Sequence, residues 1–339
     1  YDCIVPGSGG KDSFYASWML KYKYGMNPLT VTWAPNIYTD WGQKNFNSWI
    51  HSGMDNYLMT SSGRSKRLLT RLALENLFHP FQPFIIGQKA FAPKMALLMK
   101  IPLIFYGENE AEYGNPIEDN SKAQRAFDYF SSSNEKEIFI AGESISSLQR
   151  NFGLTQAELA PYLPENALAL KANGTEVHYL GFYLRWHPQS AYYFAVENGG
   201  FTTSPERTAG TYSKYSSIDD KIDDLHYYTT FIKFGIGRAT YDAAQEIRSG
   251  DLTRNEALLL IKRYDGEFPE RWARELFEYL SLDKASFPKA YKSFEHPAMD
   301  QTYFEALSNK FRSPHLWQYG KDGWSLRYQI FDFLIGCKT

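Results

Sequence analysis

Residues 1–13 have the sequence YDCIVPGSGGKDS. The apolar run at residues 3–5 predicts a short buried strand, and the pattern after Asp12 predicts a helix. A glycine-rich turn between a strand and a helix directs backbone N–H groups and the positive end of the helix dipole at one point, so it binds anions. We therefore predict a phosphate site in this turn. Its residues are Ser8, Gly9, Gly10, Lys11 and Ser13.

Two other phosphate-binding loops differ from this one in spacing. A Walker loop requires Ser or Thr directly after its lysine, and a dinucleotide fingerprint requires a third glycine at the same place, but Asp12 stands there. The hexapeptide SGGKDS at residues 8–13 resembles instead the PP-loop of the ATP pyrophosphatase superfamily. Such enzymes split ATP between the α and β phosphates and adenylate an acceptor oxygen. The alternative is a chance Gly/Ser turn before a helix.

Composition restricts the class of protein. The chain has 339 residues, a formal net charge of −2, 22% charged and 43% hydrophobic residues, which is typical of a folded globular protein. This balance does not favour nucleic acid as a partner. Runs of about 18 apolar residues are absent, so no membrane span is expected. Two cysteines make no disulfide framework, which favours a reducing, cytoplasmic location.

Segments typical of strands and of helices alternate through residues 1–109. Strands are expected at 3–5, 28–34, 57–60 and 102–106, and helices at 12–24, 40–50, 65–78 and 83–100. This alternation predicts an α/β fold with a doubly wound parallel sheet. Ligands bind such sheets at the carboxyl ends of the strands. Those ends are the glycine loop, Thr32 with Trp33, and residues 106–109.

The chain divides into four expected parts. Residues 1–109 are the ATP-binding core, and residues 110–175 are an insertion or lid, with a plain surface excursion as the alternative. Residues 176–240, which begin with another strand, complete the active site and the substrate contacts. Residues 241–339 form a helical C-terminal region, whose end from residue 310 is aromatic without a clear period.

Later stretches choose among PP-loop enzymes. YGEN at 106–109, SIDDK at 217–221, KFG at 233–235, RAT at 238–240 and LLLIKRYD at 258–265 occur in this order. They resemble the N-acetyl sugar amidotransferase family, which includes the pseudaminic acid, legionaminic acid and O-antigen amidotransferases of bacterial surface glycans. The resemblance implies that a sugar acetamido oxygen attacks the α-phosphorus of ATP, and that ammonia then displaces AMP to give an acetamidino group.

The resemblance also implies roles for single residues. The catalytic residues would be Lys11, Asp12 and Glu108. Asp12 would hold Mg²⁺ or orient the loop, with capping of the following helix as an equal alternative. The ATP-binding residues would be Ser8, Gly9, Gly10, Lys11, Asp12, Ser13, Thr32, Trp33 and Gly107, with Thr32 and Trp33 beside the adenosine. The substrate-binding residues would be Asn109, Lys233 and Arg238.

The sequence leaves alternatives open for two groups of charged residues. Lys233 and Arg238 could be surface cations near the start of a helix. The acidic residues at 219–224 could bind a metal, but we expect them to form a solvated helix N-terminus, where negative charge is favourable.

The source of ammonia implies a partner. A glutaminase needs an activated cysteine with a paired histidine or at a free N-terminus. Cys3 lies in the expected central strand and Cys337 lies near the end, so we expect a separate glutaminase subunit, with a channelling subunit as a further partner. The family usually carries a zinc-binding, cysteine-rich segment before the PP-loop. The chain starts inside a strand, so we expect that this segment precedes residue 1; the alternative is that this member lacks it. Zinc would belong to that segment alone.

Two rival functions remain. One is a tRNA-modifying PP-loop enzyme of the thiolation type, which commonly needs catalytic cysteines or an iron–sulfur cluster and a basic face. The other is a nucleotide-binding regulatory protein without chemistry. The charge of −2 and the two isolated cysteines argue against the first, and the intact Lys-Asp-Ser of the loop argues against the second.

Overall fold

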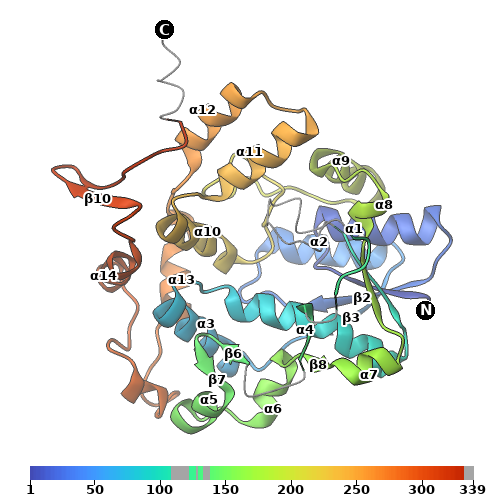
Figure 1. The fold of residues 1–339 in the computed structure, drawn as a ribbon, viewed down its shortest axis with the longest axis horizontal. Helices are drawn as coiled ribbons and strands as arrows, with labels where there is room; N and C mark the ends of the chain where they lie inside the picture. Colours follow the sequence, from blue (N-terminus) through green and yellow to red (C-terminus); the bar gives the residue numbers. More distant parts are fainter. Residues whose placement is uncertain (108–121, 127–128, 133–137, 332–339) are drawn as a thin grey trace.

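A computed structural model describes residues 1–107, 122–126, 129–132 and 138–331. Its centre is a parallel sheet of five strands in the order β3-β2-β1-β4-β9 (Figure 1). The strands are β1 (Cys3–Pro6), β2 (Pro28–Trp33), β3 (Asp55–Met59), β4 (Leu103–Tyr106) and β9 (Glu176–Tyr179). The chain is therefore an α/β protein with a central parallel sheet, as the alternating pattern predicts.

Helices cover both faces of this sheet because its strands carry apolar side chains on both sides. Along β1, Cys3 and Val5 pack in one cluster with Trp186, and Ile4 packs on the other face with Leu69 and residues of the following helices. The helices of the N-terminal part are α1 (Lys11–Trp18), α2 (Asp40–His51), α3 (Gly63–Leu77) and α4 (Gln82–Met99). The layering is that of a doubly wound sheet.

The first helix differs from the expected continuous one at 12–24. It is α-helical from Lys11 to Trp18 and continues as a π-helical turn, Met19–Lys23. The chain then leaves the helix at Gly25, whose φ of +68° is left-handed backbone that glycine adopts without strain. The expected stop at Gly25 is thus confirmed, and the internal change of helix type is not visible in the apolar pattern.

The described part of residues 110–175 packs against α4. Its elements are β5 (Ser131–Ser132), β6 (Phe139–Ile140), β7 (Glu143–Ser144), α5 (Ile145–Phe152), α6 (Gln156–Leu159), β8 (Glu165–Asn166) and α7 (Ala167–Ala172). Leu148, Tyr162 and Leu170 are buried in the same cluster as Ile4 and Val31. This portion therefore contributes to the main core, and the lid function stays a prediction.

The remaining elements are mostly helical. They are α8 (Leu180–Tyr183), α9 (Pro188–Gly199), α10 (Lys221–Phe234), α11 (Arg238–Ser249), α12 (Arg254–Tyr264), α13 (Ala273–Leu280) and α14 (Gln301–Phe311). Capping boxes begin α6 in the preceding part of the chain, at Thr155 with Glu158, and α12, at Thr253 with Glu256. Where the sequence shows no period, an antiparallel hairpin of β10 (Trp317–Gly320) and β11 (Gly323–Leu326) projects beside α14 (Figure 1).

The C-terminal helices share a core with the N-terminal ones. Leu74 and Phe78 of the α3 end pack with Ile222 of α10, Leu276 of α13 and Phe304 of α14. The side chain of Arg71 on α3 is fully buried and reaches across to them, where Nη1 donates to the carbonyl of Leu280 at 2.7 Å. This shared core holds α10 against the end of α3. None of the described helices is long and apolar enough to cross a membrane.

Candidate active site

The strand order predicts where on the sheet a ligand would bind. Chain direction along the sheet reverses between β1 and β4, and in open α/β sheets ligands bind outside the carboxyl ends of the strands at such a switch point. The glycine loop follows β1 there, and Gly107 follows β4. The loop opens into a cavity of about 740 Å³, which is within the range of small-molecule sites.

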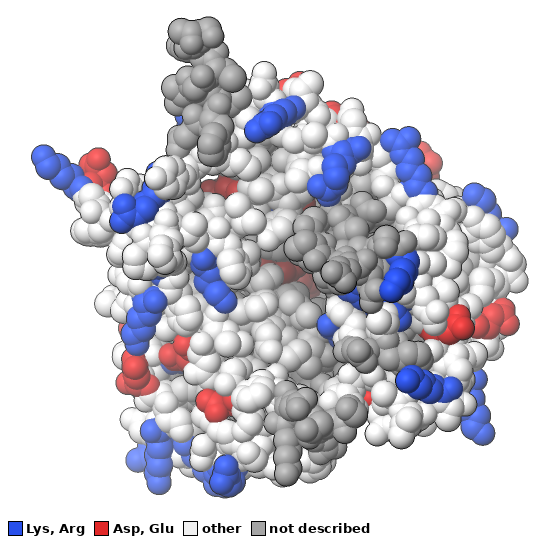
Figure 2. Space-filling view, in the orientation of Figure 1, with Lys and Arg blue, Asp and Glu red and all other residues white. Residues whose placement is uncertain are grey.

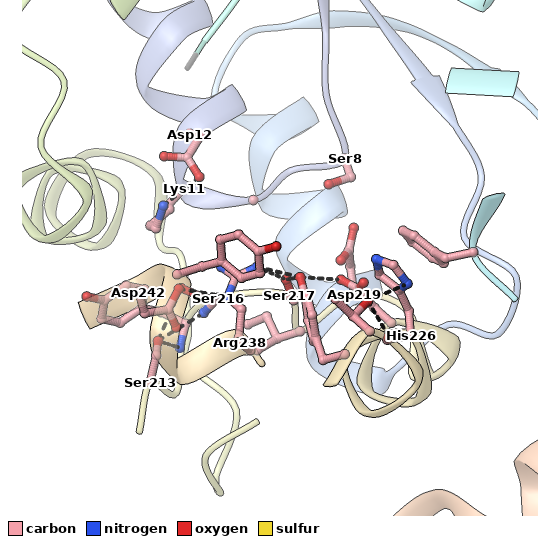
Figure 3. Close-up of a pocket in the computed structure, with 18 of the residues that line it drawn as sticks. Ser8, Lys11, Asp12, Ser213, Ser216, Ser217, Asp219, His226, Arg238 and Asp242 are labelled. Atoms are coloured by element: carbon pink, nitrogen blue, oxygen red, sulfur yellow. Dashed lines mark hydrogen bonds and ion pairs between the residues drawn. The ribbon is translucent and has the colours of Figure 1, made fainter. Parts of the chain in front are cut away.

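The cavity lies between the glycine loop and the helices α10 and α11 (Figure 3). The face of the molecule shown in Figure 2 has a hollow near its centre, and acidic side chains are visible inside it. One wall is formed by residues 8–12 of the loop, together with Gly42 and Asn45 of α2. The opposite wall is formed by residues 213–219 and by side chains of α10 and α11.

The shape of the loop depends on two glycines. Gly9 has a φ of +84°, and a Cβ built there would lie 2.6 Å from Cα of Phe46. A Cβ on Gly7 would lie 2.2 Å from Cβ of Ser13. The Ser13 hydroxyl accepts from the backbone N–H of Gly9 at 3.2 Å and donates to the carbonyl of Gly10 at 3.0 Å. Ser13 therefore holds the loop from inside and does not line the cavity, unlike Ser8, Gly9 and Gly10.

Lys11 and Asp12 stand at the start of α1 and both line the cavity. Lys11 is 6% exposed, and its Nζ lies 2.5 Å from Oδ2 of Asp12. Oδ1 of Asp12 is buried and has no hydrogen-bond partner among the residues that the structure describes. The Asp12 side chain does not cap the helix, since the N-cap residue is Gly10 and no side chain bonds there. The capping alternative for Asp12 is thus wrong, and one of its oxygens is available to a ligand.

Two basic side chains of the opposite wall face the same cavity. Lys233 near the end of α10 donates to the carbonyl of Leu77 at 2.7 Å, and burial lowers the pKa of its amine. Arg238 opens α11, and its Nε lies 2.7 Å from Oδ1 of Asp242. The Arg238 side chain is 12% exposed, so it is not the surface cation of the alternative. The structure brings both to the cavity of the loop, and their role in substrate binding stays a prediction.

The acidic residues at 219–224 are not solvated, which corrects the expectation for them. Asp220 and Asp224 are 2% exposed and Asp223 is 7% exposed. Asp219 and Asp223 line the cavity, and burial raises the pKa of both carboxyls. The Ser8 hydroxyl bonds Asp219 and Arg238 lies near Asp223, and each counteracts part of the shift. The charge pattern predicts a solvated helix start because the sequence does not show which tertiary elements cover it.

Asp220 explains why this wall is held opposite the loop. Its carboxylate accepts from the backbone N–H of Ile37 at 3.1 Å and caps α10 through the N–H of Ile222 at 3.0 Å. Nζ of the buried Lys66 donates to the carbonyl of Ala34 at 2.6 Å in the same turn. Burial lowers the pKa of Lys66 to about 8, with the nearby Asp220 acting against it. The start of α10 is thereby fastened to the turn after β2.

Aromatic rings that no sequence motif predicts line one end of the cavity. The rings of His79 and His226 stack at 4.5 Å with an angle of 13° between their planes, and Phe81 stacks on His226 at 5.6 Å. Burial, and then the charge of Lys233, lowers the pKa of His79 to about 4. Burial also lowers the pKa of His226. Both rings are neutral near pH 7. They come from the end of α3 and from α10, so no local spacing pairs them.

Three other sequence-predicted residues that the structure describes, Thr32, Trp33 and Gly107, do not line the cavity. Thr32 and Trp33 are 1% and 3% exposed, and the Trp33 ring packs edge-on against Tyr162 at 5.1 Å in the core. Their assignment to the adenosine has no support from this cavity. A Cβ on Gly107 would lie 2.9 Å from the ring of Trp186 and 3.5 Å from the carbonyl oxygen of Asp12, so Gly107 lies beside the start of α1. Glu108 and Asn109 lie outside the described residues.

Mg²⁺ in nucleotide sites is commonly held by one or two carboxylates together with substrate phosphates. Asp12, with an unpartnered oxygen, and Asp219 and Asp223, which line the cavity, fit this donor set. No group of three or more metal-ligating side chains occurs among the described residues.

One comparison with known proteins bears on the second wall. Residues 209–330 match the family model "LPS biosynthesis protein WbpG-like, C-terminal domain". This stretch resembles a lipopolysaccharide biosynthesis protein. The matched range contains α10 and α11 and so most of the wall opposite the loop, and the glycine loop lies outside it. No curated protein matches the chain closely enough to count as a relative.

Proposed function

We propose that the chain is an ATP-dependent amidotransferase of lipopolysaccharide biosynthesis, acting in the cytoplasm, that converts a sugar acetamido group into an acetamidino group. The observation that carries the proposal is one cavity between two walls. One wall is a glycine loop of the PP-loop pattern at the switch point of a parallel sheet, and the other belongs to the stretch that matches the WbpG-like domain.

The charges of the cavity suit transfer of an adenylyl group. In the proposed first step the acetamido oxygen bonds to the α-phosphorus of ATP, and the bond from that phosphorus to the bridging oxygen of pyrophosphate breaks. Lys11 and the backbone of Gly9 and Gly10 would neutralise the pyrophosphate as it leaves, and Arg238 would act from the opposite wall. Such fixed charges in a buried site stabilise the transition state because they need no reorganisation.

In the second step ammonia bonds to the imidate carbon, and the carbon–oxygen bond breaks. AMP leaves with the former acetamido oxygen, and the sugar keeps a protonated amidine. Mg²⁺, when bound, would compensate the phosphate charges. Asp12 and Asp219 are the residues that would hold it, since both line the cavity beside the loop.

Ammonia would come from a separate glutaminase subunit. Cys3 is fully buried in β1, and burial raises the pKa of its thiol to about 12, so it does not form a thiolate near neutral pH. Cys337 lies outside the described residues.

The test is a product assay with purified chain, MgATP, an ammonium salt and a panel of UDP- and CMP-linked acetamido sugars. We expect AMP, pyrophosphate and an amidine in equal amounts, with AMP formation dependent on the sugar. Lys44→Met on the exposed face of α2 is a matched control for changes at Lys11. Release of ADP and phosphate, or no AMP with any sugar, would contradict the proposal.

A further inference from the structure

The α11 side of the cavity contains a buried amide whose donor is unused. Gln245 on α11 is 8% exposed and lines the cavity, and its Nε2 has no hydrogen-bond partner in the described structure. Buried amide donors in folded proteins are nearly always paired, because an unpaired one loses its hydration without compensation. An acceptor on a bound molecule in the cavity would satisfy it.

The next residue is a carboxyl group without a cation. Glu246 is 7% exposed and lines the cavity, and its Oε2 accepts from the hydroxyl of Tyr212 at 2.9 Å. Within the described ranges it takes part in no ion pair that would make this place attractive to a phosphate. Asp242, one turn before it, is already paired with Arg238. A group that donates a hydrogen bond, rather than a phosphate, is therefore favoured at this place.

An aromatic ring completes this side. Tyr215 lines the cavity, and Tyr192 stacks on it with centroids 4.4 Å apart and an angle of 11° between the planes, which holds the ring in place. Nζ of Lys11 lies 5.9 Å from the centre of the Tyr215 ring. Tyr215 therefore lies beside the phosphate loop as well as on the α11 side of the cavity. Tyrosine offers both an apolar ring and a polar end.

We propose that Tyr215, Gln245 and Glu246 bind the hydroxyl-bearing ring of the acetamido sugar. These three residues, two of them on α11, are called the α11 wall. Gln245 donates to a sugar oxygen, Glu246 accepts from a sugar hydroxyl, and the ring packs on Tyr215. The phosphates of the bound molecules then lie toward Lys11, Lys233 and Arg238. This assignment rests on the proposed function, because it names the place of that reaction's acceptor.

The test measures binding without turnover. The probes are N-acetylglucosamine, UDP-N-acetylglucosamine and UDP, titrated calorimetrically into wild type, into Gln245→Met and into the control Gln43→Met, whose residue is exposed on α2. Methionine keeps the length of the side chain and removes its hydrogen bonds. We expect Gln245→Met to weaken the sugar-containing probes roughly tenfold and UDP less than twofold, since one net hydrogen bond is about that large. The control should bind all three like wild type.

Equal affinity of wild type and Gln245→Met for every probe would overturn the assignment. It would also be overturned if Gln245→Met lost as much affinity for UDP as for the sugar-containing probes, or if wild type bound neither sugar probe. Glu246→Gln, which keeps the shape of the side chain, provides a second variant if Gln245→Met does not fold, and it should weaken the same probes. The product assay is read separately. If wild type forms AMP but Gln245→Met binds the sugar probes like wild type, the α11 wall alone is refuted. If Gln245→Met loses sugar binding but wild type forms no AMP, the reaction alone is refuted.

Discussion

The two walls of the cavity are built in different ways. The main part of the loop wall is one contiguous stretch, residues 8–12, whose shape follows from local glycine geometry and from the internal hydrogen bonds of Ser13. The opposite wall is assembled from residues 213–219, α10 and α11, and it depends on buried charges that tertiary contacts hold. A contiguous wall can be recognised by its motif, whereas an assembled wall becomes visible only when the chain is folded.

This difference predicts what damage to each wall does. Changes in the loop wall should affect chemistry more than stability, because in the proposed reaction its charged group contacts the substrate. Changes in the assembled wall should affect stability and its dependence on pH, because its carboxyls are buried. Three substitutions with matched controls test the contrast.

The largest effect is expected for Lys11→Met. Removing one preorganised charge from a site of developing negative charge costs roughly 10² to 10³ in turnover. The variant should fold, since methionine fills the space of the lysine chain at this 6% exposed position. Sugar-dependent AMP release measures the effect, with Lys44→Met as control. Wild-type turnover in Lys11→Met would remove the loop wall from the mechanism.

The assembled wall is tested by Arg271→Met. Nη2 of Arg271 lies 3.0 Å from Oδ2 of Asp224, which is 2% exposed. Removing one partner of a buried ion pair destabilises a protein by roughly 3 kcal/mol, because the other charge stays buried and unpaired. Arg274→Met should leave the free energy of unfolding unchanged, since Arg274 and its partner Glu278 are exposed.

The same variant has a predicted pH dependence. Burial raises the pKa of Asp224 to about 6 in the folded protein, although Arg271 acts in the opposite direction. The folded state thus holds this proton more tightly than the unfolded chain, where the pKa is about 3.9, so stability falls as pH rises from about 4 to 6. Without Arg271 the folded pKa rises further. Urea denaturation should show a larger deficit of Arg271→Met at pH 8 than at pH 5, and equal deficits would count against a buried charge.

The smallest effect is expected for Gly9→Ala. Alanine at a φ of +84° costs roughly 1–2 kcal/mol, and its Cβ would meet Phe46. Gly10 is the matched control, because a Cβ there has Ser8 Oγ as its nearest neighbour at 3.8 Å. Thermal unfolding should separate Gly9→Ala from Gly10→Ala and wild type. Similar midpoints for all three would show that the loop is not held as described.

Sequence reasoning succeeds where the physical cause is local. The apolar run at Cys3, Ile4 and Val5 and the end of the first helix before Gly25 depend on causes within a few residues, and each is found where expected. The parallel sheet follows from the alternation of such segments.

It fails where distant elements decide the environment. Asp220 is buried because residues after β2 donate to it, and the stacked rings of His79 and His226 meet only through tertiary packing. Trp33 faces the core because α4 lies against it, with Gly87 directly under the ring. Gln245 and Glu246 carry no motif, and only their burial in the cavity wall distinguishes them from other polar residues of α11.

The central claim is that the sugar acetamido oxygen attacks the α-phosphorus of ATP. It is tested most directly with an acceptor whose acetamido oxygen is labelled with ¹⁸O, incubated with the chain, MgATP and ammonium, followed by mass spectrometry of the nucleotide product. The account predicts that the label is transferred to AMP, because the adenylated oxygen leaves with it. Unlabelled AMP, or ADP as the product, would contradict the account.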